Sequence, residues 1–118
     1  MRATLLLPML LIGGPGHGRV PVATPSPEGH TIATRFAPPP GFTRITVQRG
    51  SFADYLRHLP LHSAGSAVRL YNGVLKARQD VHAAVVDLSV GTRDLQQCAD
   101  AVMRLRAEHL YGCGRQDD

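Results

Sequence analysis

The residue best suited to chemistry in this sequence is Cys98, which lies in about the first turn of a segment with helical periodicity. A thiol in the first turn of a helix is favoured as the thiolate, because free N–H groups and the helix dipole stabilise negative charge there. Cys98 is therefore a candidate nucleophile, which would need a histidine as its base. Its place on the apolar face also suits an inert core cysteine, and the residues alone favour that second interpretation.

The histidines do not complete an obvious site with this cysteine. His82 opens the strand predicted before the Cys98 helix, at the opposite end of that unit, which argues against a direct Cys98–His82 pair. His58 and His62 have the i,i+4 spacing of a helical metal pair, but Pro60 lies between them and breaks the helix. No cluster of cysteines or carboxylates completes a metal site. We therefore predict no metal ligands and no cofactor.

The segment 95–110 is predicted to form one long amphipathic helix, with Thr92 or Asp94 as its N-cap and Gly112 after its end. At 100° per residue, five side chains share one face, which we expect to pack on a sheet. They are Leu95, Cys98, Val102, Leu105 and His109.

The preceding residues predict a small sheet and a second, shorter helix. Residues 42–48 and 81–90 are rich in β-formers and predict strands. Residues 68–76 predict a hairpin, because Asn72-Gly73 suits a type I′ turn. Ser51, followed by Asp54, predicts the start of a helix that ends before Pro60. The expected fold class is α+β: a small, partly antiparallel sheet with a short N-terminal helix and a long C-terminal helix.

Three regions are expected along the 118 residues. Residues 1–18 resemble a secretory signal peptide, with a positive residue, a short apolar run and small residues at the cleavage position. Residues 19–41 are rich in proline and glycine and predict an extended lead-in, and residues 42–118 predict the folded domain. We therefore expect an exported protein, located in the periplasm, the cell envelope or the extracellular space.

Charge and cysteine content restrict the possible partners. The net charge of +4 comes from dispersed arginines, and only 5% of residues are aromatic, so the pattern of a nucleic-acid-binding protein is missing. We expect no transmembrane segment in the mature chain, because the N-terminal apolar run is too short to span a bilayer. Cys98 and Cys113 would lie roughly 20 Å apart if the helix is continuous, which predicts free thiols. No specific partner can be named.

From about Arg35 onward, the sequence resembles an uncharacterised bacterial family, DUF 4846. The resemblance is strongest at residues 83–88 and 93–105, and it extends to 40–44, 50–57, 59–61 and 68–76. It implies an exported or envelope-associated protein. Because it covers only the first part of the usual length of the family, it also implies that the chain is the N-terminal part of a truncated domain.

A second, weaker resemblance concerns activity. A cysteine that opens a helix, followed by a distant histidine, is similar to papain-like cell-wall amidases and peptidases of the NlpC/P60 and CHAP groups. This resemblance implies that Cys98 is the nucleophile, that Gln97 lines an oxyanion site, and that the substrate is a peptide or amide of the cell wall. The histidine would lie beyond Asp118, so the chain alone is expected to be inactive. The alternative is a non-catalytic structural or binding module of the envelope with Cys98 in its core.

Overall fold

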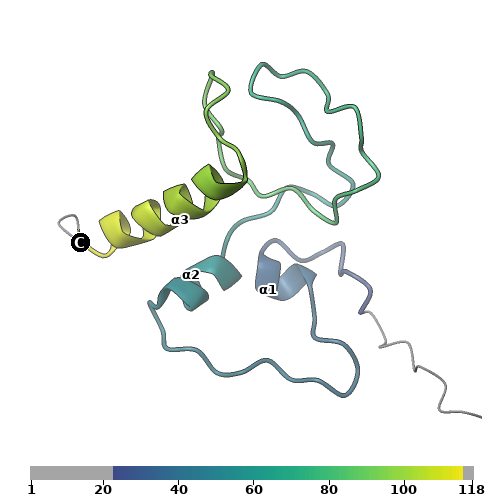
Figure 1. Cartoon of the computed structure of the whole chain (residues 1–118). Helices are drawn as coiled ribbons and strands as arrows, with labels where there is room; N and C mark the ends of the chain where they lie inside the picture. The colour runs from purple at the N-terminus through teal and green to yellow at the C-terminus, as the bar shows by residue number, and fades with distance from the viewer. Residues whose placement is uncertain (1–22, 116–118) are drawn as a thin grey trace, which may run out of the picture.

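The computed structural model describes residues 23–115, in which three α-helices are joined by long irregular segments (Figure 1). The helices are α1 (Ile32–Arg35), α2 (Phe52–Arg57) and α3 (Cys98–Gly112). Within this range the β pairing consists of three isolated antiparallel bridges, and no sheet forms. The predicted α+β fold with a small sheet is therefore wrong. The predicted signal peptide, residues 1–18, lies outside the described residues.

The centre of the structure is the short segment 59–62, which pairs with a different segment along each of its edges. Residues 30–32 bond to one edge and residues 85–87 to the other. Leu59 and Leu61, which are 5% and 7% exposed, are the buried hydrophobic side chains of the described residues. The backbone bonds are Leu61 N–H to His30 O at 2.9 Å, Ile32 N–H to Leu59 O at 3.3 Å, His62 N–H to Val85 O at 2.9 Å, and Asp87 N–H to Pro60 O at 2.8 Å.

Arg35 is the buried charged residue of this centre, with 2% of its surface exposed. Its guanidinium donates from Nε to the Gly29 carbonyl at 2.7 Å and from Nη2 to the His62 carbonyl at 3.1 Å. Gly29 has no room for a side chain, because a Cβ there would lie 2.4 Å from the backbone nitrogen of Arg35. The stretch 19–41, expected to be an extended lead-in, therefore contributes both α1 and a central buried side chain.

The short helix α2 begins where the sequence predicts. Ser51 is its N-cap, and its hydroxyl accepts the N–H of Asp54 at 3.2 Å. The carboxylate of Asp54 in turn accepts the N–H of Gly50 at 2.9 Å. His58 caps the C-terminal end, two residues before Pro60, so the predicted start and stop of this helix are both confirmed.

The predicted hairpin turn lies at the predicted residues, but it is not of type I′. Arg69 and Leu75 form its single bridge. Gly73 has a φ of 82°, whereas no described residue other than glycine has a positive φ, so Asn72 is not left-handed as a type I′ turn requires. The side-chain oxygen of Asn72 instead accepts the N–H of Val74 at 3.1 Å. This geometry fits a three-residue loop that closes on a left-handed glycine.

Neither of the two predicted strands, residues 42–48 and 81–90, forms over its predicted length. In residues 42–48 no bridge forms, and Ile45 is 78% exposed. In residues 81–90 only Val86 pairs, through its bridge to Leu61. An alternating pattern becomes a strand only where neighbouring backbone and a second apolar layer are present. Among the described residues of these two segments, only 85–87 have neighbouring backbone, in the segment 59–62.

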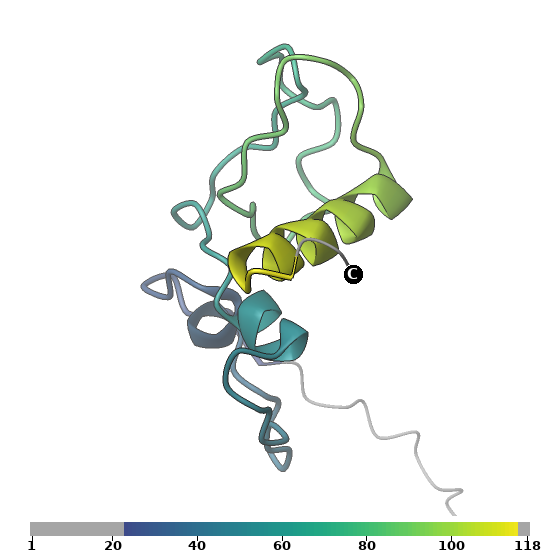
Figure 2. The same ribbon diagram turned by 90° about the vertical axis from the view of Figure 1, so that its left-hand side faces the viewer.

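The long helix is confirmed, but its start and its buried face are not. α3 begins at Cys98 with Gln97 as N-cap, rather than at Thr92 or Asp94. None of its residues is buried, and Val102, on the face predicted to pack, is 62% exposed. The reason is that α3 has no sheet beneath it, and α2 is the helix that it contacts within residues 23–115, as both views show (Figures 1 and 2). Within residues 23–115, no helix is long and apolar enough to cross a membrane.

We predict that replacing Arg35 by alanine loosens the central segment. The carbonyls of Gly29 and His62 lose their donors, and a buried carbonyl without a partner costs about 1–3 kcal/mol. Amide hydrogen exchange at Leu61 should then accelerate at least tenfold, since about 1.4 kcal/mol corresponds to that factor. The matched control is Arg78→Ala, which removes an exposed Arg78–Asp80 pair and should leave the exchange of Leu61 within a factor of two to three. Equal rates in both variants would show that Arg35 does not stabilise the centre.

Candidate functional site

Cys98 is the first residue of α3, and its thiol is free and exposed. The preceding residue, Gln97, is also exposed, and its N–H donates to the carboxylate of Asp100 at 3.1 Å. The thiol is thus accessible at a helix N-terminus, as the nucleophile hypothesis requires. The carboxylate of Asp100 occupies the same turn and opposes further negative charge there.

The structure does not bring a base to Cys98. The ring of His82 bonds through Nε2 to the carbonyl of Ser66 at 3.1 Å, in a different part of the chain. His109 lies on α3 itself, eleven residues further on, which places it roughly 16 Å along the helix axis. Across residues 23–115 no histidine bonds to the Cys98 thiol, and no group of three or more metal-ligating side chains is placed to hold an ion.

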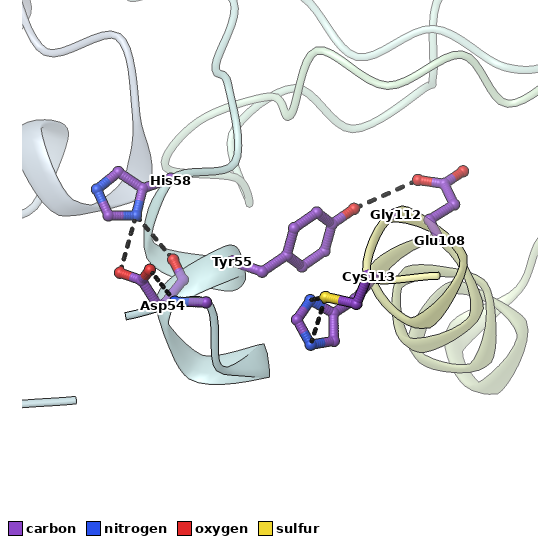
Figure 3. A pocket seen from close by; sticks show the side chains of 8 residues that line it. Asp54, Tyr55, His58, Glu108, Gly112 and Cys113 are labelled. Atoms are coloured by element: carbon purple, nitrogen blue, oxygen red, sulfur yellow. Dashed lines mark hydrogen bonds and ion pairs between the residues drawn. The ribbon is translucent and has the colours of Figure 1, made fainter. Parts of the chain in front are cut away.

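A pocket of about 360 Å³ opens between α2 and α3, near the C-terminal end of α3 (Figure 3). Its size falls within the range of ligand pockets in proteins. It combines carboxylates, imidazoles, a phenol and a thiol from the two helices and their ends. The lining residues are Gly50, Asp54, Tyr55, His58, Glu108, His109, Gly112 and Cys113.

Tyr55 reaches across this pocket from α2 to α3, as Figure 3 shows. Its hydroxyl donates to the carboxylate of Glu108 at 3.4 Å, and Glu108 also accepts from Nε of Arg104 at 2.8 Å. Burial raises the pKa of Tyr55 above its ordinary value, and the negative charge of Glu108 and the hydrogen bond to it raise it further. The positive charge of Arg104 partly opposes this rise in the pKa. The pair therefore links α2 to α3 as long as the phenol is protonated.

The ring of His109 packs between the rings of α2. Its centroid lies 5.4 Å from that of Phe52 and 5.3 Å from that of Tyr55, and the guanidinium of Arg106 lies 5.2 Å from the centre of the Phe52 ring. These contacts are the side-chain packing between the two helices, and they fix the orientation of the imidazole.

Cys113 lies beside this imidazole, with its sulfur 4.0 Å from both ring nitrogens of His109. Because neither nitrogen is closer, the sulfur is in contact with the ring but is not aimed at one base atom. Sequence reasoning placed His109 on the apolar face and considered Cys113 only for a disulfide. The i,i+4 spacing of His109 and Cys113 was the signal that could have paired them. Tyr55 had no such signal, because its partner Glu108 is 53 residues away.

Residues 32–118 match the family described as Domain of unknown function (4846), DUF4846. The match covers well over half of the chain, so the chain belongs to this family. No curated protein and no solved structure matches the chain.

The Tyr55–Glu108 contact predicts a pH dependence. Because the folded pKa of Tyr55 lies above the unfolded value near 10, its stabilising contribution is fully present below pH 10 and is lost as the pH rises through the raised pKa. An ultraviolet absorbance titration of the variant Tyr71→Phe/Tyr111→Phe isolates this phenol. Glu108→Gln in that background should lower the titration midpoint of Tyr55 towards the ordinary value. An unchanged midpoint would mean that the carboxylate does not act on the phenol.

Proposed function

We propose that this chain belongs to an exported protein of the cell envelope in which Cys98 is the nucleophile of a cysteine hydrolase. The substrate class is a peptide or amide, such as those of the cell wall. The observation that supports this proposal most is the exposed Cys98 thiol at the first position of α3. An inert core cysteine would be enclosed, and this one is not.

The reaction would follow the usual course of thiol hydrolases. The Cys98 sulfur attacks the substrate carbonyl, a base takes the thiol proton and passes it to the departing amine, and water then hydrolyses the thioester. Gln97, exposed beside the thiol, would help to stabilise the oxyanion. The base would have to come from outside residues 23–115, because none of the described histidines bonds to Cys98. The residues described here would thus supply the nucleophile and its position, not the complete catalytic set.

A second candidate is a non-catalytic binding module, and the pocket between α2 and α3 favours it. The pocket is lined by residues from both helices and their ends and does not include Cys98. In this case the function would depend on Tyr55 and Glu108. A binding module with Cys98 in its core does not fit the exposed thiol.

Alkylation by iodoacetamide at mildly acidic pH separates the two candidates. The variant Cys113→Ser leaves Cys98 as the sole thiol, and Cys98→Ser leaves Cys113 as the matched comparison. If Cys98 is a nucleophile activated by its place at the start of α3, the folded Cys113→Ser variant should react at least several-fold faster than the same variant unfolded in urea. A folded rate no higher than the unfolded one would refute the hydrolase proposal.

Export is tested separately, by expression of the full chain in a bacterial host and mass spectrometry of the product. Cleavage after Gly18 predicts a mature protein that begins at Arg19 and is recovered outside the cytoplasm. The control is a chain in which Leu6 and Leu7 are both replaced by Arg, which interrupts the apolar run and should abolish cleavage. A product that retains Met1 or Arg2 in both cases would argue against a signal peptide.

A further inference from the structure

A hollow of about 550 Å³ lies among the irregular segments that join α2 to α3 along the chain. The ribbon of these segments lies above the helices in Figures 1 and 2. Two stretches of chain form most of its walls, residues 66–70 from the first arm of the hairpin and residues 85–91. No backbone hydrogen bond joins these two stretches in the described part of the chain. We call the space between them the groove.

Each wall of the groove uses one edge of its backbone for pairing and keeps a free N–H group on the other edge, where the Val86 carbonyl already accepts the N–H of Leu88 at 3.0 Å. Arg69 and Leu75 form a pair flanked by the bonds Leu70 N–H to Val74 O and Lys76 N–H to Val68 O. In such a pair the N–H and C=O of Arg69 point away from the hairpin partner. Val86 has the same relation to Leu61, so its N–H also points outward. Among the described residues, the N–H groups of Arg69 and Val86 have no backbone partner.

The walls of the groove combine apolar side chains with polar ones such as Ser66 and Ser89, and one end is basic. Leu70 and Val90 line it while remaining 43% and 41% exposed. An adjoining hollow of about 160 Å³ is lined by three cationic side chains, Arg69, Lys76 and Arg93, against one carboxylate, Asp94. None of these three cations takes part in the ion pairs found within residues 23–115. The groove is thus complementary to a chain that is extended, partly apolar and acidic.

We propose that the groove binds an acidic segment of a partner protein in extended conformation, as a strand added between residues 68–70 and 86–88. The outward N–H groups of Arg69 and Val86 would donate to the main chain of this segment, which is the mode of recognition by strand addition. Alternate apolar side chains would contact Leu70 and Val90, and carboxylates would reach Lys76 and Arg93. The inference is independent of Cys98 and of any hydrolase activity.

The test is fluorescence polarisation of the full chain with a labelled peptide of alternating glutamate and valine. Saturable binding is expected, and two comparison peptides probe its basis. Alternating lysine and valine reverses the charge, and N-methylation of the glutamate–valine peptide removes its main-chain donors and blocks strand pairing. Both should bind at least tenfold more weakly. Absent binding, or equal binding by either comparison peptide, would overturn the proposal.

A matched pair of variants locates the site. Lys76→Glu/Arg93→Glu reverses two charges in the basic hollow that adjoins the groove. Arg49→Glu/Arg78→Glu makes the same change in net charge at exposed residues that line neither hollow. The first variant should weaken binding of the glutamate–valine peptide about tenfold and the second by less than threefold, with circular dichroism confirming that both fold like the parent. Equal losses would show that only net charge matters. Sedimentation of the unlabelled chain as a dimer that Lys76→Glu/Arg93→Glu dissociates would assign the groove to a second copy and overturn the assignment to a partner.

Discussion

The buried guanidinium of Arg35 and the segment 59–62 that it contacts hold together the described part of this chain. The segment has neighbours on both edges, and Arg35 adds a third attachment through the carbonyl of His62. Because the guanidinium donates to two carbonyls and not to a carboxylate, its position depends on backbone geometry, which only the folded arrangement supplies. With Leu59 and Leu61 as the buried apolar side chains, these polar contacts carry an unusual share of the tertiary structure.

This centre also determines where chemistry can occur. Pro60 ends α2 and at the same time belongs to the central segment, so the position of α2 is fixed from there. α3 is then oriented by side chains of α2, mainly by Tyr55 against Glu108 and His109. The result is a pocket at the C-terminal end of α3, while Cys98 remains exposed at the other end. Cys98 and Cys113 therefore lie at opposite ends of α3, in different surroundings.

The sequence predicted the positions of three features correctly, and each of them depends on residues that are close together in the chain. The Ser51 cap, the stop before Pro60 and the turn at Asn72-Gly73 each depend on residues within a few positions of one another. The type of the turn was wrong, because the Asn72 side chain bonds to the backbone two residues on and holds the asparagine out of the left-handed region. The predicted start of α3 was also wrong by several residues, since Thr92 and Asp94 are preferred caps by residue type, whereas the helix begins after Gln97.

What the sequence alone determined is therefore the existence of two helices, the place of one turn, membership of DUF4846 and the presence of a thiol at the start of a helix. What only the tertiary structure decided is which segments pair and what surrounds each thiol. The strand pattern of residues 42–48 indicates that this segment could pair, but it does not indicate that a partner segment lies beside it. The burial of Arg35 and the contact of Tyr55 with Glu108 join residues 27 and 53 positions apart, and no local pattern encodes such distances. Pairing across such separations is a property of the whole chain, because the entropy of closing each loop is offset only by the contacts that other loops make at the same time.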